Sequence, residues 1–244
     1  MKMNIIKDQI KKIVCKKYQY EALPFSIEVT IPKKYSHGDY TSNIAFKLSK
    51  ELHKEPIEIA NEITKELKDN YIFEDIVVIS PGFINFFINA NALYEKLNQK
   101  NLMKIPLKFI DEEYIQSYVK TSSKEKIASM QYVHSRIYSI IKIFKQEGIN
   151  MDEKIHLVEY KFSSLEKQIL KKICIYEEVI HKDLETIFLY GIDLSELFYK
   201  IEEKTLFRKL EKNAQYVMLN IIECIRIIIQ KILQAFLLDA PEKM

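Results

Sequence analysis

Glycine occurs at only four of the 244 positions, 38, 82, 148 and 191, and proline at only six. β-Rich architectures need many tight turns, and tight turns draw heavily on these two residue types. Isoleucine, leucine, lysine and glutamate abound instead, and the last three are strong helix formers. We therefore expect a mostly helical protein, whose 48% hydrophobic content is ample for a buried core.

The same scarcity of glycine excludes the common nucleotide-binding loops. Neither a GxGxxG loop nor a Walker loop can be written with glycines at these spacings, so the usual backbone cradles for nucleotide phosphates are missing. The cysteines, Cys15, Cys174 and Cys224, are far apart and form no CxxC or Cys/His pair at zinc spacing. We expect no metal or other cofactor, and a reducing compartment.

The sequence carries no pattern of a targeting or membrane segment. Its first residues, MKMNIIKDQIKKIV, lack the apolar core of a signal peptide. The most apolar stretch, Ile221 to Leu238, is interrupted by charged and amide side chains and reads as a buried helix. These features predict a cytoplasmic protein without a membrane partner.

Charge is distributed unevenly along the chain. The formal net charge is only +3 and the pI about 8.5, so the overall balance does not by itself indicate a nucleic-acid-binding protein. The first segment is nevertheless rich in lysines: Lys7, Lys11, Lys12, Lys16, Lys17, Lys33 and Lys34. Two interpretations remain open, a solvated helix face and a surface that faces a polyanion.

Residues 1 to about 100 mix helical and strand patterns. Apolar residues at helical spacing predict a helix over 4–18, and alternation predicts a strand over 25–31. Two short helices are expected after His37, the second with Pro56 in its first turn.

A hairpin-like pair of strands is predicted next. The β-branched run 72–79 and the run 83–88 flank Pro81-Gly82, a typical turn dipeptide. The expected fold of this part is α+β, with a small antiparallel sheet.

The sequence pattern changes near Pro106, where we place a boundary between domains 1–104 and 108–244. Beyond it, the sequence shows almost only helical periodicity. The strongest apolar stripe consists of Ile127, Met130, Val133, Ile137, Ile140, Ile141 and Phe144 and ends near Gly148. Further helices are expected at about 162–174, 176–190, 193–204 and 206–238. The second domain is therefore predicted to be an all-α helical bundle.

The stretch YSHGDYTSNIAFKLSK, residues 35–50, brings a histidine, a glycine and an aspartate together. Histidine is a common general base, but no nucleophile-like partner accompanies His37 at a motif spacing. Asp39 precedes an apolar-periodic run and is a typical helix N-cap, while Gly38 permits backbone conformations that other residues resist. We expect a helix-capping turn here and not a catalytic site.

Three motifs of the first half resemble the N-terminal additional domain of arginyl-tRNA synthetases. They are His37-Gly38-Asp39-Tyr40 followed by Asn43-Ile44-Ala45-Phe46, then Ile59-Ala60, then Pro81-Gly82-Phe83-Ile84-Asn85-Phe86. Their order and spacing make the resemblance specific.

The second half is similar to the DALR-type anticodon-binding domain of the same family. The segments concerned are Gln131-Tyr132-Val133-His134-Ser135-Arg136, the aromatic pair Phe198-Tyr199, and the ending Ala240-Pro241-Glu242-Lys243-Met244. Two positions depart from the family pattern: Met218 stands where an arginine is usual, and Leu237 where a glycine is usual.

In the family, a large nucleotide-binding catalytic domain lies between these two parts. Its HIGH-like motif and KMSK-like loop do not occur here, and residues 101–111 stand where that domain would be. The resemblance thus implies two tRNA-binding domains, one for the D-loop at the elbow and one for the anticodon stem and loop, without the enzyme.

The resemblance also implies candidate tRNA-binding residues. In the first half these are Asn85, on the strand presented to the D-loop, and Phe83 as a stacking neighbour; the alternative is that Phe83 is core and Asn85 ties down the hairpin. In the second half Tyr132, Arg136, Tyr199 and Met244 match motif positions. Arg136 is a phosphate contact or the partner of an acid, and the two tyrosines are either core or contact.

Three functional hypotheses follow. The first is a non-catalytic adaptor that binds an arginine tRNA and presents or withholds it for another factor, such as a tRNA-modifying enzyme. The second is the tRNA-binding subunit of a split arginyl-tRNA synthetase, acting with a separate catalytic chain. The third is a protein-interaction module that has lost RNA binding.

Overall fold

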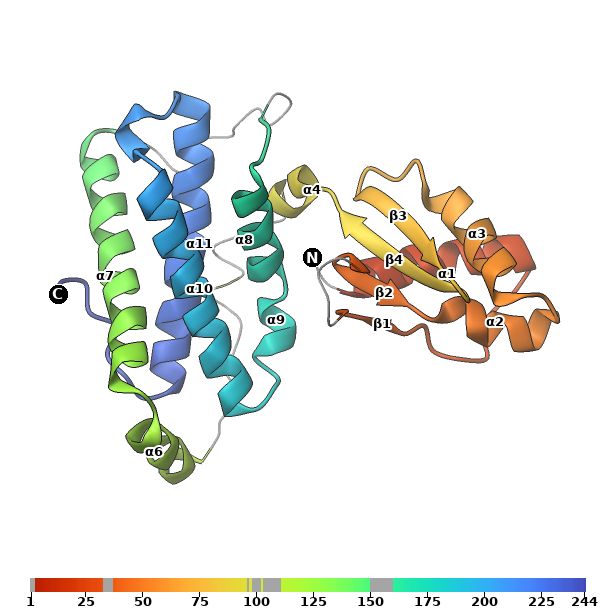
Figure 1. Cartoon of the computed structure of the whole chain (residues 1–244), viewed down its shortest axis with the longest axis horizontal. Helices are drawn as coiled ribbons and strands as arrows, with labels where there is room; N and C mark the ends of the chain where they lie inside the picture. Colours follow the sequence, from red (N-terminus) through yellow and green to blue (C-terminus); the bar gives the residue numbers. More distant parts are fainter. Residues whose placement is uncertain (1–2, 33–36, 96, 98–101, 103–110, 150–159) are drawn as a thin grey trace. The chain divides into compact units, whose positions relative to one another are not determined.

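The computed structural model describes residues 3–32, 37–95, 97, 102, 111–149 and 160–244. The chain folds into two compact units, Met1–Lys96 and Leu97–Met244 (Figure 1). The first is α+β with a small antiparallel sheet and the second is helical, which confirms the predicted fold class. Pro106, where the domain boundary is predicted, lies outside the described residues, so that boundary stays a prediction.

The first unit is built on a four-stranded antiparallel sheet with the strand order β1-β2-β4-β3. Its strands are β1 (Val29–Thr30), β2 (Tyr40–Ser42), β3 (Phe73–Ile79) and β4 (Phe83–Ile88). β3 and β4 form the predicted hairpin, closed by a turn in which the Gly82 N–H donates to the Ile79 carbonyl at 2.9 Å.

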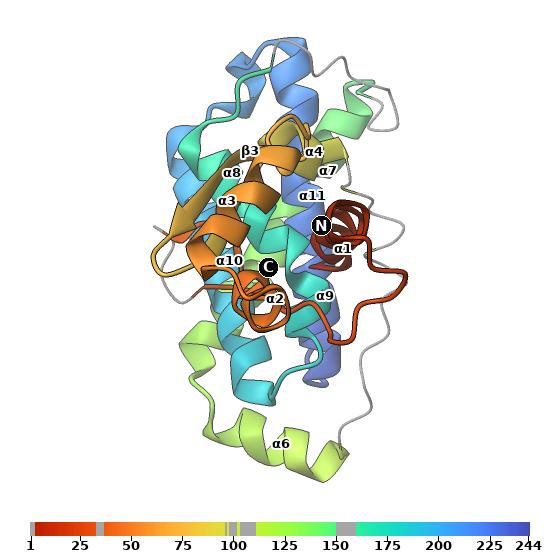
Figure 2. The same ribbon diagram turned by 90° about the vertical axis from the view of Figure 1, so that its right-hand side faces the viewer.

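Helices α1 (Met3–Tyr18), α2 (Ile44–Leu52) and α3 (Pro56–Leu67) cover one face of this sheet (Figures 1 and 2), and α4 (Ala90–Glu95) follows β4. Every second residue of β4 points to the helices. The buried side chains between sheet and helices include Ile6, Ile10, Val14, Ile44, Leu48, Ile59, Ile63, Leu67, Ile84, Phe86 and Ile88. The helical spacing of the apolar residues in α1 to α3 therefore gives the core, as the sequence predicts.

Two local predictions for this unit are wrong. The strand expected over 25–31 shortens to β1, because its partner β2 is only three residues long and pairs with Val29 and Thr30 alone. Asp39 does not cap a helix, because β2 intervenes before α2 begins. Its carboxylate instead accepts from the Ile88 N–H at 2.8 Å, which ties it to the end of β4.

Gly38 has the backbone freedom that the sequence predicts for it. Its φ is +85°, in the left-handed region, and a Cβ built there would lie 2.8 Å from the carbonyl oxygen of Phe86. The chain passes so close to β4 that the next N–H, of Asp39, donates to the same oxygen at 2.8 Å. The HGD motif is therefore a backbone junction between β2 and β4.

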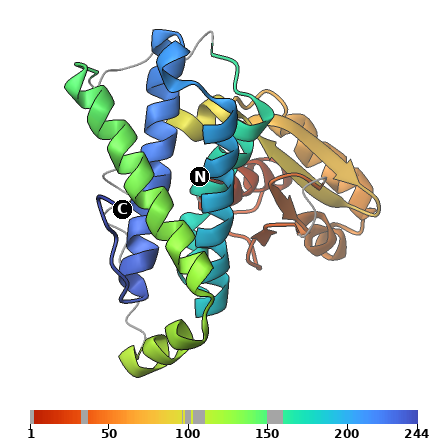
Figure 3. The same ribbon diagram turned by 60° about the vertical axis from the view of Figure 1, so that its left-hand side comes forward.

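The second unit is a bundle of α6 (Glu112–Thr121), α7 (Lys124–Gln146), α8 (Ser164–Cys174), α9 (Tyr176–Val179), α10 (Leu184–Lys204) and α11 (Lys212–Ala235). A short 3-10 helix, η3 (Phe207–Lys209), precedes α11. Side chains accept hydrogen bonds from the first turns of α6, α7, α8 and α10; these N-caps are Asp111, Ser123, Ser163 and Asp183. Helices α7, α10 and α11 pack against one another along their lengths (Figure 3).

Three of the predicted helices have other bounds in the structure, and the one expected over 206–238 consists of η3 and α11. The stripe over 127–144 is confirmed as α7, but the helices expected at 176–190 and 193–204 are the short α9 and one continuous α10. Gly191 does not break α10, because it lies where the helix meets its neighbours: a Cβ there would lie 2.7 Å from Sδ of Met130 and 3.3 Å from Cδ1 of Ile232. Among the described helices, none is long and apolar enough to cross a bilayer.

Candidate nucleic-acid interface

The segment Gln131–Arg136 lies on α7 and divides its side chains between two faces. Because residues three or four apart share a helix face, Ser129, Tyr132 and Arg136 lie on one side. Gln131 and His134 lie on another. The first set meets α10, and the second meets the C-terminal segment.

Tyr132 and Tyr199 form a stacked aromatic pair between α7 and α10. Their ring centroids are 6.0 Å apart with an interplanar angle of 18°. They remain 42% and 37% exposed, so neither is a core residue. The Ser129 hydroxyl donates to the hydroxyl of Tyr199 at 3.3 Å and helps to fix that ring. Exposed, flat rings of this kind are the usual platform for an unstacked RNA base.

Arg136 lies one turn beyond Tyr132 and forms an ion pair with Glu202 of α10. Nε of Arg136 donates to Oε1 of Glu202 at 2.5 Å. This bond raises the pKa of the Arg136 guanidinium above its ordinary value. Of the two sequence interpretations of Arg136, pairing with an acid is present in the structure; a contact with RNA stays a prediction.

The other face of α7 holds the end of the chain, which lies alongside this helix (Figure 1). Nε2 of Gln131 donates to the Asp239 carbonyl at 2.9 Å, and Nδ1 of His134 lies 2.9 Å from the Pro241 carbonyl oxygen. A hydrogen bond with Glu242 raises the pKa of the Tyr138 hydroxyl. Met244 follows this fastened segment and is 71% exposed.

His134 is buried among charged groups of α11. Its Nε2 lies 3.1 Å from NH1 of Arg226, whose Nε and NH2 donate to both carboxylate oxygens of Glu223 at 2.8 Å. Burial lowers the pKa of His134, the Pro241 hydrogen bond opposes that shift, and the Arg226 charge adds to it. The imidazole is therefore held neutral.

The first unit presents the two remaining candidates on β4. Asn85 pairs with Thr41 of β2 and Val77 of β3, on the sheet face opposite the helices, and only 5% of its surface is exposed. Phe83, at the start of β4, is 41% exposed, and its ring lies 5.0 Å from that of Phe46 on α2. Their RNA contacts stay predictions.

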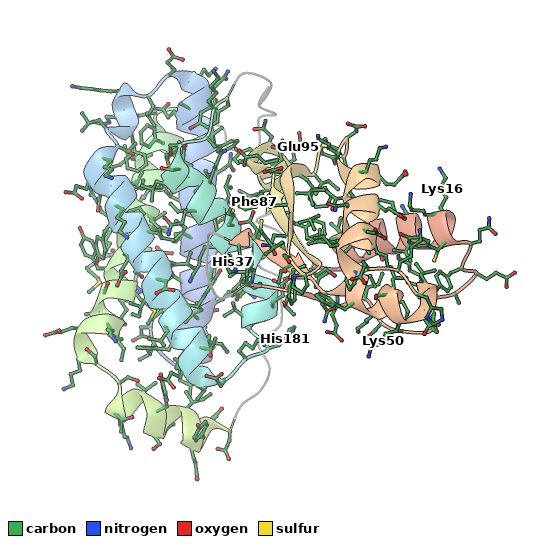
Figure 4. All side chains as sticks on the ribbon, turned by 45° about the vertical axis from the view of Figure 1, so that its right-hand side comes forward. Lys16, His37, Lys50, Phe87, Glu95 and His181 are labelled. Carbon is green, nitrogen blue, oxygen red and sulfur yellow. The ribbon has the colours of Figure 1, made fainter. Side chains whose placement is uncertain are left out.

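The lysines of α1 lie mostly on its exposed side: Lys11, Lys12, Lys16 and Lys17 are exposed and Lys7 is half-buried. Lys17 forms ion pairs with Glu62 and Glu66 of α3. Lys16 extends from the exposed side of the helix (Figure 4). Among the residues that the structure describes, no three His, Cys, Asp or Glu side chains form a group that could hold a metal ion.

The two units match two different family models. The model of the arginyl tRNA synthetase N terminal domain matches residues 3–88, and that of the DALR anticodon binding domain matches residues 130–244. The chain is homologous to two regions of arginyl-tRNA synthetases. Residues 89–129 separate the two matches, and the catalytic domain is absent from the chain.

Arginine–tRNA ligases are among the individual proteins that this chain is similar to. The arginine–tRNA ligase of Thermotoga maritima is 40% identical over 93 residues, which are 38% of this chain and 16% of that protein. The arginine–tRNA ligase of Metamycoplasma arthritidis is 37% identical over 86 residues, 34% of this chain and 16% of that protein. A solved arginyl-tRNA synthetase of Thermus thermophilus covers 90% of this chain at 14% identity, with 38% of its own chain covered and a TM-score of 0.34. The chain thus spans a small part of the relatives it matches.

Two features of the anticodon-binding domain were not predicted from the sequence. Glu202 was missed as a partner of the Tyr132, Arg136 and Tyr199 surface. Its position three residues after Tyr199, on the same face of α10, was the available signal. The fastening of the C-terminal segment by Gln131 and His134 was also missed, because no local pattern links residues more than 100 positions apart.

Proposed function

We propose that the chain is a non-catalytic tRNA-binding protein that recognises an arginine tRNA in the cytoplasm and serves as an adaptor. The observation that carries this proposal is the exposed Tyr132 and Tyr199 stack beside Arg136, in a domain homologous to an anticodon-binding domain. Aromatic faces bind bases whatever their sequence, and an adjacent guanidinium adds hydrogen bonds.

The absence of the catalytic domain supports the non-catalytic part of the proposal. The HIGH-like motif and the KMSK-like loop, which hold ATP in the family, do not occur in this chain. We expect the purified protein to catalyse neither aminoacylation nor ATP–pyrophosphate exchange. Activity of the chain alone, free of contaminating synthetase, contradicts this expectation.

Binding is tested by titrating the chain with a fluorescent arginine tRNA and, as a specificity control, a tRNA for another amino acid. We expect preference for the arginine tRNA, and affinity that falls steeply between low and moderate salt because lysines displace counterions from phosphates. Tyr199→Leu should weaken binding about tenfold, the worth of one stacked base. Tyr114→Leu, which removes an exposed ring from α6, should leave it unchanged. Equal effects of the two substitutions contradict the assigned surface.

The adaptor role is tested by purification from a cell lysate, with sequencing of the RNA and identification of the proteins. An arginine tRNA together with a tRNA-modifying enzyme supports the adaptor. A catalytic synthetase chain identifies a split enzyme, for which the missing catalytic domain is the favouring observation. Protein partners without RNA contradict the proposal.

A further inference from the structure

The ion pair between Arg136 and Glu202 lies beside the stacked rings of Tyr132 and Tyr199. Tyr132 and Arg136 are four residues apart on α7, and Tyr199 and Glu202 are three apart on α10, so each helix contributes one ring and one charge on the facing side. The rings stack at 6.0 Å, and the charges join at 2.5 Å.

We infer that these four side chains form a site that reads the edge of one unstacked RNA base, and that Glu202 is its specificity-determining residue. This inference rests on the proposed tRNA binding and assigns Arg136 a different role from the phosphate contact predicted from the sequence. The rings supply the stacking platform. The ion pair supplies donors and acceptors at its edge.

The charges beside the stacked rings favour a base edge over a phosphate as the ligand. The Glu202 carboxylate lies against Arg136 and neutralises its charge, and a phosphate would have to approach that carboxylate as well. Phosphate contacts depend on excess positive charge that displaces counterions. A base edge carries no net charge and presents donors beside acceptors, so it complements a guanidinium and a carboxylate together.

Arg136 and Glu202 both have hydrogen-bonding groups that their ion pair does not use. The pair uses Nε of Arg136 and Oε1 of Glu202. The terminal N–H groups of the guanidinium and Oε2 of the carboxylate lie outside this bond. The bond between Nε and Oε1 places these donors and this acceptor next to one another, so one base edge can contact both groups.

The bundle offers a matched control pair. NH2 of Arg208 and Oε1 of Glu147 also lie 2.5 Å apart, between η3 and the end of α7. This pair has the same chemistry and is not part of the Tyr132 and Tyr199 stack. Glu147→Gln therefore reports what the loss of an exposed carboxylate does by itself.

The first experiment measures base preference with the full chain. Its probes are anticodon stem-loop RNAs of an arginine tRNA in which each loop position in turn carries each of the four bases. We expect the wild-type chain to discriminate about tenfold or more at one position. Glu202→Gln should change the preferred base or flatten the preference to below about threefold at that position alone, and Glu147→Gln should preserve it. Equal preference profiles of wild type and Glu202→Gln overturn the inference.

The second experiment separates base from phosphate at Arg136. Arg136→Lys keeps the charge and loses the fork, so it should lose base preference as fully as Arg136→Gln, with the salt slope of log affinity unchanged in both. If Arg136→Lys retains wild-type binding and Arg136→Gln lowers the slope by about 0.7, Arg136 contacts a phosphate and the inference is overturned. Thermal melting of each variant identifies any general loss of fold.

The two proposals fail in different ways. A wild-type chain that binds none of the stem-loops and no arginine tRNA refutes the proposed function and this inference together. A wild-type chain that binds them while Glu202→Gln strengthens binding to all sequences equally, with a steeper salt slope, refutes the inference alone. In that case Glu202 only reduces the charge of the surface.

Discussion

Nδ1 of His134 lies 2.9 Å from the carbonyl oxygen of Pro241, and this contact joins the middle of α7 to the end of the chain. The opposite ring nitrogen, Nε2, lies 3.1 Å from NH1 of Arg226. A guanidinium only donates, so Nε2 accepts and Nδ1 carries the proton that it donates to Pro241. The neutral ring therefore links α7, α11 and the C-terminal segment, and a charged ring cannot keep both bonds.

We expect acid to weaken the link between α7 and α11 at His134, because a protonated ring still donates from Nδ1 to Pro241 but no longer accepts from Arg226 at Nε2. Burial lowers the folded-state pKa of His134 below its ordinary value of about 6.5, so the unfolded chain binds the proton more readily. The stability that the neutral ring contributes is complete above that ordinary value and is lost as the pH falls through the lowered folded pKa. Arg226, Glu223 and Glu242 are the charged groups that act on the ring.

The measurement is urea unfolding between about pH 8 and pH 5 for wild type, His134→Gln and His181→Gln. The His134→Gln variant should lose less stability on acidification than wild type. His181 is exposed between α9 and α10 (Figure 4), and its replacement should leave the wild-type pH profile unchanged. Parallel profiles for wild type and His134→Gln contradict the assignment.

The Glu223 and Arg226 pair beneath His134 gives a second prediction. Both side chains are nearly buried, and two hydrogen bonds of 2.8 Å join them. Arg226→Leu should lower the free energy of unfolding by about 3 kcal/mol, because it leaves the Glu223 carboxylate buried without its partner. Glu223→Leu combined with Arg226→Leu should recover most of that loss. A double variant as unstable as the single one, in denaturant unfolding, contradicts the buried-charge explanation.

Two of the three glycines with positive φ give a third prediction. Gly38 and Gly148 have nearly equal φ angles, +85° and +86°, but a Cβ at Gly38 meets backbone while a Cβ at Gly148 has nothing within 4 Å. Gly148→Ala should therefore cost about 1 kcal/mol, the conformational part alone. Gly38→Ala should cost clearly more, about 3 kcal/mol, because β2 must move away from β4. Equal losses in thermal unfolding would show that β4 adjusts freely.

The sequence predicts those features that depend on local periodicity. Apolar spacing identifies α1, α2, α3 and α7, and the Pro81-Gly82 turn identifies the β3–β4 hairpin. Prediction from the sequence fails where residues distant in the chain determine the local structure. Gly191 interrupts the helical pattern of the sequence but not α10, because the close approach of Met130 and Ile232 requires a small residue there. Asp39 stands where the sequence predicts an N-cap, but its carboxylate accepts a hydrogen bond from the Ile88 N–H at the end of β4.

The candidate interface divides in the same way. Tyr132, Arg136 and Tyr199 were chosen by motif position, and the structure brings them together at one junction of α7 and α10. Glu202 belongs to no motif used in the sequence argument and appears only once the two helices are packed. Met244 was also chosen by motif position, but the segment before it is held by Gln131 and His134, which long-range packing alone connects to it.

The fourth prediction concerns Asn85. If its amide faces RNA, Asn85→Ala should weaken tRNA binding by roughly 1 kcal/mol, about fivefold, and leave the melting temperature nearly unchanged. Asn70→Ala is the matched control, because the Asn70 amide donates to Gln9 and accepts from the Ile72 N–H within the fold. That variant should lose stability and keep affinity. Loss of stability by Asn85→Ala equal to its loss of affinity would instead assign Asn85 to the packing of the sheet.

The last prediction concerns which unit carries the affinity. The sequence predicts that residues 101–111 stand in place of the catalytic domain. If about ten residues join the two units, that connection reaches roughly 35 Å at full extension, so simultaneous binding of elbow and anticodon loop on one tRNA is not expected. The helical unit holds the Tyr132, Tyr199 and Arg136 surface. Fragment 108–244, checked for folding by circular dichroism, should therefore bind an arginine tRNA and its isolated anticodon stem-loop nearly as tightly as the intact chain does. Fragment 1–104 should bind both weakly.

If both units engage one tRNA, the affinity of the intact chain for that tRNA should exceed the affinity of either fragment by on the order of a hundredfold. A fragment 108–244 that binds neither RNA, beside an intact chain that binds tRNA tightly, would contradict the prediction and show that the short connection lets both units act together.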